Sequence, residues 1–276
     1  MLKLSKRISV RQQCMATAQV YLKRFYSRVE IRRTNPYLVI TTAVYLACKM
    51  EEAPQHIRLV VTEARTLWSE FISLDTSKVG ECEFFLISEM SSQLLVHQPY
   101  RTLLSLRSEL PLNDEDVSLT RSIINDTFMT DLPITYSPHT ICLVAILLAL
   151  VLRPSQGSSS QGSSSQATGS AAAAGLAAVQ ATLSQVQGRG ALPSTPPTTT
   201  TEGVSTPDAR EKAAQDARVV KIHHFVAWLS ESQVDIAAMV DATQEIISFY
   251  ECYEQYNDKL TREQVNRFVK ARGLDK

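Results

Sequence analysis

The chain of 276 residues carries 28 basic and 28 acidic side chains, and 44% of its residues are hydrophobic. This apolar content supports a sizeable core in one or two domains, and the balanced charge excludes a global field that would draw the protein to nucleic acid or to an anionic membrane. The longest apolar run, residues 140–152, is too short to cross a bilayer, and no signal peptide opens the sequence, so we expect no membrane partner.

Glycine placement predicts a helical fold. All but two of the nine glycines, Gly80 and Gly273, lie between residues 157 and 203. A strand-rich fold would carry glycine turns about every 8 to 12 residues along the whole chain. Residues 154–216 are mostly Ser, Gly, Ala, Thr and Pro, a composition that cannot offset the entropy lost on ordering. We therefore expect an all-α protein with a disordered insertion over residues 154–216.

Helix signals begin close to the start of the chain. Ser9, followed three residues later by Gln12, forms a capping box and predicts a helix that ends near residue 28. The next helix opens with Asn35 as cap and Pro36 in its first turn, and its sequence is PYLVITTAVYLACKM. A helix that is apolar on nearly every side is surrounded by other helices. Further helices are predicted over residues 56–68, 77–94 and 99–110.

The second half repeats this pattern of helix starts. Asn113 with Asp116 predicts one cap, and Ser137 with Pro138 opens a second nearly uniform apolar helix, HTICLVAILLALVL. The offsets from the first half are 104 and 102 residues, from position 9 to 113 and from 35 to 137. Such a repeat predicts two similar helical bundles in tandem.

Three more helices are expected after the insertion, over residues 217–229, 235–256 and 261–271. Thr261 with Gln264 forms a capping box for the last of them, and Gly273 ends it. The folded part of the chain therefore continues beyond the insertion.

No catalytic or metal-binding pattern is present. The five cysteines lie far apart in apolar stretches, which predicts reduced, buried thiols in an intracellular protein, and the histidines add no ligand pattern. The chain also has no glycine motif for a nucleotide, and Glu51 and Glu52 are adjacent near a helix end, which is poor geometry for acid and base work. We predict no metal, no cofactor and no enzyme.

Short motifs in both halves resemble the cyclin C family, and most closely its fungal form, the cyclin subunit of the Mediator kinase module. They are RQQCMATAQVYLKRFY, NPYLVITTAVYLACKMEE, GECEFFLISEM and LVHQPYRTL. The resemblance covers residues 3–152 and 217–276, and it implies two tandem cyclin boxes. It also implies a nuclear regulatory subunit that activates a cyclin-dependent kinase acting on the RNA polymerase II machinery.

The resemblance implies a kinase-docking site on the first box. The family's key lysine corresponds to Lys49, whose ammonium can reach carbonyls at the end of a kinase helix. Its acidic companion matches Glu83, with Glu81 on the same helix as an alternative, and Glu52 is assigned to the same contact. An ordinary surface ion pair would explain the same residues. The second repeat has Val151 where the first has Lys49, so only the first box is expected to dock the kinase.

A groove between the two boxes is the second implied site. The family lines it with a Trp, an Asn and an Asp, and this chain has Asn125 and Asp126 but Arg121 in place of the Trp. The resemblance implies that other Mediator kinase-module subunits bind there. A solvated helix face is the alternative interpretation of Asn125 and Asp126.

The implied domains are a first box over residues 1–98, a second over 99–153 and 217–260, the insertion at 154–216, and a C-terminal helix at 261–276. The family has an N-terminal helix and an opening box helix before the stretch that matches residues 2–11, and both are absent from this sequence. We therefore expect the first box to lack its opening helix and to expose apolar surface of its central helix.

The basic character of the first 33 residues supports a different class of function. Residues 3–33 carry nine Lys or Arg side chains and one acid, Glu30. A kinase-free cyclin-fold adaptor that binds nucleic acid, as in transcription factor IIB, would use such a run on phosphates. That class expects a zinc ribbon and a basic second repeat, which this sequence lacks, so direct nucleic-acid binding is not the favoured interpretation. A scaffold that has lost kinase binding is the third alternative.

Overall fold

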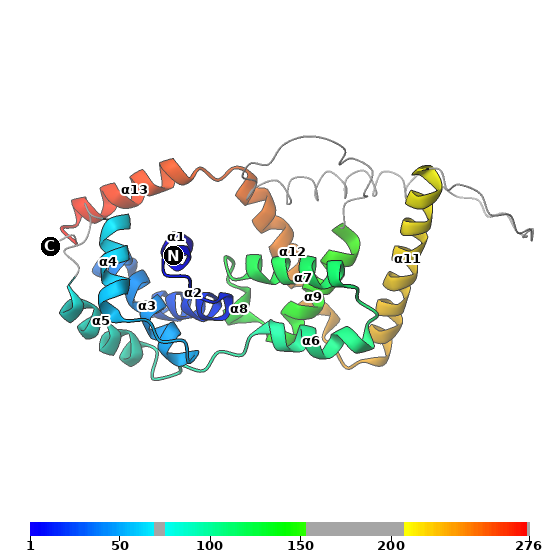
Figure 1. Ribbon diagram of the computed structural model, residues 1–276, viewed down its shortest axis with the longest axis horizontal. Helices are drawn as coiled ribbons and strands as arrows, with labels where there is room; N and C mark the ends of the chain where they lie inside the picture. Colours follow the sequence, from blue (N-terminus) through cyan, green and yellow to red (C-terminus); the bar gives the residue numbers. More distant parts are fainter. Residues whose placement is uncertain (69–74, 153–206, 275–276) are drawn as a thin grey trace, which may run out of the picture. The chain divides into compact units, whose positions relative to one another are not determined.

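The computed structural model describes residues 1–68, 75–152 and 207–274, with the backbone alone described for residues 207–215. All regular secondary structure in these ranges is helical, which confirms the expected all-α class (Figure 1). The chain divides into two compact units, and the dividing points fall within helices α7 and α9. Most of the predicted insertion, residues 153–206, lies outside the described residues.

Unit 1 comprises Met1–Pro99, Asn125–Ile141 and Gln255–Lys276. Its helical elements are α1 (Leu2–Arg7), α2 (Gln12–Tyr26), η1 (Ile31–Arg33), α3 (Pro36–Met50), α4 (Ile57–Leu67), α5 (Thr76–Glu89), α8 (Leu132–Thr135) and α13 (Asp258–Ala271). Unit 2 comprises Tyr100–Ile124 and Cys142–Glu254. Its elements are α6 (Pro99–Glu109), most of α7 (Asp114–Thr127) and α9 (Pro138–Leu152), α11 (Pro207–Glu231) and α12 (Ile236–Glu254). The predicted limits of the two boxes stay predictions, because compactness alone does not define a cyclin box.

Helix α3 is the centre of unit 1. The Asn35 side chain accepts a hydrogen bond from the Tyr37 backbone N–H, as a cap should, and α2, α4 and α5 pack around the helix (Figure 1). Its residues are buried along nearly the whole length, and Met50, at 40% exposure, is the large apolar side chain of α3 that remains open to solvent. The expected exposure of apolar surface on the central helix is therefore wrong for most of the helix, because its apolar residues other than Met50 are buried or half-buried.

The C-terminal helix explains part of this coverage. Helix α13 contributes Val269, which is fully buried, to the core of unit 1. The Tyr37 hydroxyl at the start of α3 donates to Asn266 Oδ1 over 2.5 Å, and the Asn35 side chain donates to the Leu274 carbonyl over 2.8 Å. Residues more than 220 positions apart in the sequence thus close the N-terminal end of α3.

Two of the predicted helix caps are wrong. Ser9 does not cap α2: it has φ 52° and follows the end of α1, where the Val10 N–H bonds back to the Ser5 carbonyl. The left-handed turn at Ser9 therefore ends one helix and cannot begin the next. The last helix starts at Asp258 and not near Thr261, because the Asn257 side chain accepts bonds from two backbone N–H groups of the first turn.

Unit 2 is built around α9, whose residues are buried from Ile141 through Ile146. The predicted cap of α7 is confirmed in both directions: the Asn113 N–H donates to Asp116 Oδ2 over 3.1 Å, and the Asp116 N–H donates to Asn113 Oδ1 over 2.7 Å. The Ser137 hydroxyl accepts from the Thr140 N–H over 3.1 Å at the start of α9. The expected helix at 217–229 is longer than predicted and begins at Pro207, within the range assigned to the insertion.

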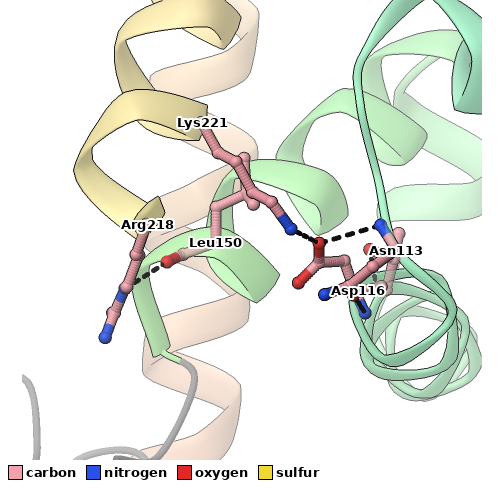
Figure 2. Close-up of polar contacts among 6 residues, drawn as sticks. Asn113, Asp116, Leu150, Arg218 and Lys221 are labelled. Atoms are coloured by element: carbon pink, nitrogen blue, oxygen red, sulfur yellow. Dashed lines mark hydrogen bonds and ion pairs between the residues drawn. The ribbon is translucent and has the colours of Figure 1, made fainter. Parts of the chain in front are cut away.

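Two basic side chains fasten α11 to unit 2, as Figure 2 shows. Lys221 pairs with the Asp116 oxygen that the Asn113 N–H also meets, and Arg218 Nε donates to the Leu150 carbonyl over 2.6 Å. One turn further along α11, Phe225 is 1% exposed. The helix is therefore held to the start of α7 and to the end of α9, where free backbone groups are most in need of partners.

Candidate functional site

Lys49 is positioned by the end of α3. It lies in the last turn of that helix, where a cation interacts favourably with the partial negative charge of the terminal carbonyls. Buried residues on the preceding turns fix the helix in the core, so the end of α3 is placed by packing. The Lys49 side chain nevertheless remains 43% exposed. The core therefore brings this ammonium group to the surface in a defined position.

Glu83 meets Lys49 from helix α5. The helix starts after Asp75, whose side chain accepts from the Thr76 N–H over 2.6 Å. Glu83 Oε1 lies 2.5 Å from Lys49 Nζ, and the Glu83 side chain is only 11% exposed. The pair is asymmetric, since the Glu83 side chain is largely buried and the Lys49 side chain is nearly half exposed. The structure thus brings together Lys49 and Glu83, the companion that the resemblance favoured, whereas the alternative, Glu81, is exposed on the same helix.

A third residue, Tyr45, supports the lysine. Lys49 Nζ lies 5.1 Å from the centre of the Tyr45 ring, within the range of a cation–π interaction. Tyr45 was not among the predicted site residues. Its spacing of four residues before Lys49 on a helix was the available signal, because such residues lie on one face.

Large apolar side chains flank the pair in the sequence. Met50, next to Lys49, is 40% exposed, and Phe84, next to Glu83, is 78% exposed. Single exposed apolar residues are ordinary on a protein surface. Apolar and aromatic groups beside a fixed charge are also what protein interfaces use at their centres.

The two glutamates after Lys49 differ. Glu52 is exposed, just beyond the end of α3, and has φ 51°. Glu51 faces the protein, where its Oε1 accepts from the Thr17 hydroxyl over 2.6 Å and from Gln98 Nε2 over 3.3 Å. Glu52 is therefore accessible to a partner, while Glu51 is engaged in a polar network that the sequence did not reveal. The contact assigned to Glu52 stays a prediction.

The residues of the predicted groove all lie on α7. Arg121 is exposed and belongs to unit 2, whereas Asn125 and Asp126 are half-buried and belong to unit 1. Their assignment to a groove between two boxes stays a prediction. Val151, in the position that corresponds to Lys49, is 38% exposed at the end of α9. A lysine of unit 2, Lys221, has a side chain that is 22% exposed and pairs with the buried Asp116.

Much of the basic N-terminal run has partners within the protein, which weakens its use as a phosphate-binding surface. Three of its residues form ion pairs and two donate to backbone carbonyls: Lys3 to Asp258, Arg7 to Glu63, Lys23 to Asp131, Arg24 to Gln93 and Leu95, and Arg28 to Glu89.

Four of the five thiols are buried as predicted. Burial raises the pKa of Cys48 and of Cys142 to about 12, and it also raises the pKa of Cys14 and Cys82. The expectation fails for Cys252, which is exposed on α12. The buried face of α12 ends at Tyr250, and Cys252 lies beyond it beside Tyr253, which is 39% exposed.

The described ranges contain no group of three or more His, Cys, Asp or Glu residues that could hold a metal ion. Among the helices described, none is both long and apolar enough to cross a membrane. The candidate site in unit 1 is therefore the exposed Lys49 with its two partners, the Glu83 carboxylate and the Tyr45 ring.

Comparison with known proteins agrees with this helical architecture. Residues 1–94 match the family model of the cyclin N-terminal domain. The fold resembles a chain in the structure of the CAK complex from Chaetomium thermophilum, with a TM-score of 0.53, 16% identity, and coverage of 98% of this chain and 68% of that chain. The class of protein is therefore a cyclin-fold protein.

Curated relatives define the family more closely. The chain is 63% identical over its whole length to the RNA polymerase II holoenzyme cyclin-like subunit of Gibberella moniliformis, covering 83% of that protein. It is 56% identical over 99% of its length to the subunit of the same name from Neurospora crassa, of which it covers 84%. The chain belongs to the family of RNA polymerase II holoenzyme cyclin-like subunits. As a cyclin, it is a regulatory subunit and not itself an enzyme.

Proposed function

We propose that this cyclin binds and activates a cyclin-dependent kinase of the Mediator complex, in the nucleus, and so regulates RNA polymerase II transcription. The observation that carries the proposal is the asymmetric pair of Lys49 and Glu83. A buried carboxylate holds an accessible ammonium at the end of the central helix. The names of the relatives, subunits of the RNA polymerase II holoenzyme, support the nuclear setting.

The mechanism follows from the position of the ammonium group. Glu83 and Tyr45 limit the directions that the Lys49 side chain can take. The unused N–H donors of Lys49 can then meet the carbonyls at the C-terminal end of a kinase helix, where partial negative charge gathers. Docking in this way holds the kinase helix in its active position. The cyclin activates by shifting a conformational equilibrium of the kinase and contributes no catalytic group.

The ion pair should contribute less to the stability of the free cyclin than to the binding free energy of the kinase complex. An exposed ion pair contributes about 0 to 1 kcal/mol to folding. Removing one member of a desolvated pair at an interface costs about 2 to 5 kcal/mol of binding. A mutation at Lys49 should therefore affect kinase binding far more than folding. Other subunits of the Mediator kinase module would bind elsewhere, with Arg121, Asn125 and Asp126 as the proposed contacts.

The test is a pull-down with the kinase from the same organism, comparing wild type, Lys49→Glu and Lys6→Glu. Lys6 is exposed on α1 and provides a charge reversal of the same size in the same unit. We expect Lys6→Glu to recover the kinase like wild type and Lys49→Glu to recover almost none. Equal recovery by all three proteins would overturn the docking assignment.

A further inference from the structure

Polar side chains on α2 and just beyond its end hold residues 89–98, which comprise the last residue of α5 and the segment that leads to α6. Thr17, Tyr21 and Arg24 lie on α2, where their spacing of four and three residues places them in one row, and Arg28 lies two residues beyond the end of the helix. Each of them contacts the joining segment. A loop tied at so many points is an unusual feature for a connection on the surface.

Arg28 holds the beginning of the segment. One of its guanidinium nitrogens donates to the Glu89 carbonyl over 2.9 Å and to the Ser91 hydroxyl over 2.5 Å. Glu89 is the last residue of α5, so the guanidinium satisfies a carbonyl that the helix leaves free. Glu83 lies on the same helix, six residues before this contact.

Arg24 and Tyr21 hold the middle of the segment. Arg24 donates to the carbonyls of Gln93, over 2.7 Å, and of Leu95, over 3.2 Å. The Tyr21 hydroxyl donates to the Leu94 carbonyl over 2.6 Å. Burial raises the pKa of Tyr21 to about 12, so its hydroxyl keeps the proton that it donates. Three consecutive carbonyls, from Gln93 to Leu95, are thus engaged.

The end of the segment is fastened by Gln98. Its Nε2 donates to the Gln13 carbonyl over 2.9 Å and to the Thr17 hydroxyl over 2.7 Å. Both acceptors lie on α2, so this helix holds the segment at its middle and its end, while Arg28, just beyond the helix, holds its start.

The segment needs this support because its backbone is strained. Ser91 and Ser92 have φ 53° and 58°, consecutive left-handed conformations that side-chain-bearing residues seldom adopt. Such a conformation persists only where the surroundings enforce it, and it is frequent at functional positions. The strained backbone at Ser91 and Ser92 therefore points to a functional role for the conformation of this segment.

The enforced conformation presents Leu95. Leu94 and Val96, on either side, pack against the core of unit 1, whereas Leu95 is 78% exposed. A leucine whose backbone is already fixed loses little further freedom when a partner covers it, so it makes an efficient apolar contact. Its segment continues directly from α5, the helix that carries Glu83.

We propose that Leu95 is an additional contact for the kinase, and that Tyr21, Arg24 and Arg28 are positioning residues that hold it in place. This inference rests on the proposed function, because it takes the kinase as the partner of the surface around α5. In this proposal the Leu95 side chain enters a shallow apolar pocket of the kinase, beside the kinase helix that meets Lys49. The row on α2 keeps the segment in its binding conformation before the kinase arrives.

The experiment measures the affinity of the purified kinase for full-length variants of this chain, together with melting temperature and hydrogen exchange. Leu95→Ala removes the contact, and Leu104→Ala is the matched control, because Leu104 is 60% exposed on α6 of unit 2. We expect Leu95→Ala to bind the kinase about tenfold more weakly, as for a residue of an interface centre, and Leu104→Ala to bind like wild type.

Tyr21→Phe tests positioning while keeping the buried ring. It should speed hydrogen exchange over residues 89–98 and weaken kinase binding about fivefold, because the apparent affinity falls with the fraction of molecules in the competent conformation. The double variant Tyr21→Phe/Leu95→Ala should bind only slightly more weakly than Leu95→Ala alone, because the side chain that Tyr21 helps to position is already absent. A purely structural hydroxyl would lower the melting temperature without changing the affinity of the folded protein.

The outcomes separate the two proposals. If Leu95→Ala and Tyr21→Phe bind like wild type while Lys49→Glu does not bind, the inference is wrong and the proposed function stands. If Leu95→Ala weakens binding while Lys49→Glu does not, Leu95 is a contact and the assignment of Lys49 is wrong. Failure of the wild-type chain to bind the kinase overturns both.

Discussion

Each unit of the molecule has a lysine that pairs with a poorly exposed carboxylate, and the two pairs differ in what the lysine can still reach. In unit 1 the side chain of Lys49 is 43% exposed beside Glu83. In unit 2 the side chain of Lys221 is 22% exposed, and its partner Asp116 is 2% exposed. Asp116 also closes the capping box of α7, so the second pair combines a contact between two helices with a helix cap.

The comparison distinguishes a pair that builds the fold from a pair that is available to a partner. Lys221 belongs to the group of contacts that holds α11 in place (Figure 2). Lys49 lies at the free end of a helix that the core already holds, and its removal leaves that core intact. A lysine paired with a carboxylate therefore joins helices of the fold in unit 2, and in unit 1 the corresponding kind of pair is the one that we propose for recognition.

The largest effect on stability is expected for Asp116→Ala. This change removes the capping carboxylate and leaves Lys221 without its counter-charge, so the free energy of unfolding of unit 2 should fall by about 3 kcal/mol. Asp114→Ala is the matched control, because Asp114 is 89% exposed and its pair with Arg107 should contribute less than about 1 kcal/mol. Urea denaturation of both variants measures the difference.

Thiol labelling shows which unit responds to Asp116→Ala. Cys142 is buried in unit 2 and Cys48 in unit 1, while the exposed Cys252 should react at once. We expect Asp116→Ala to speed the labelling of Cys142 and to leave that of Cys48 unchanged. Equal acceleration at both cysteines would mean that the two pairs do not act on separate units.

Arg218→Ala should have an intermediate effect. It removes a charge-assisted hydrogen bond to the Leu150 carbonyl at the end of α9, which corresponds to about 2 kcal/mol. Arg218→Lys is the control, since an ammonium group can restore the bond in part. The prediction fails if both variants melt at the temperature of the wild type.

Lys49→Ala should destabilise the protein by only about 1 kcal/mol, because the Lys49 side chain is 43% exposed and its truncation opens the Glu83 carboxylate to water. The same variant should lose most of its affinity for the kinase. Calorimetry and a kinase titration on one preparation measure the two quantities. A large loss of stability with normal kinase binding would place Lys49 with Lys221 among the structural lysines.

The smallest effect is expected for Val151→Lys, which gives unit 2 a lysine in the position of Lys49. Val151 is 38% exposed, so the free energy of unfolding should change by no more than about 0.5 kcal/mol. The variant should still bind one kinase per chain, because the added lysine alone does not supply the fixed pair that Glu83 gives to Lys49. Binding of a second kinase would show that the lysine alone is sufficient.

The sequence predicted most of the helices because they depend on local pattern, whereas it predicted the central pair through the family resemblance. The apolar helices around Asn35 and Ser137 and the capping box of Asn113 are confirmed by the observed hydrogen bonds. Lys49 and Glu83 were chosen by family resemblance, and the structure places them 2.5 Å apart.

What the sequence missed depends on contacts between distant segments. The coverage of α3 by α13 and the row on α2 that holds residues 89–98 involve residues between 61 and 239 positions apart. Local pattern carries no information on such contacts. The error at Ser9 has a related cause, since a serine that ends one helix in a left-handed turn looks like one that caps the next.

The most direct test of the account is a charge exchange between Lys49 and Glu83, read by kinase activity. Lys49→Glu alone places two carboxylates together and should lower both the melting temperature and kinase activation. Adding Glu83→Lys restores opposite charges, so the melting temperature should recover. Kinase activation should not recover, because the exchange moves the cation from the accessible position to the buried one. Recovery of activation together with stability would contradict the account, because it would show that the pair acts only within the cyclin.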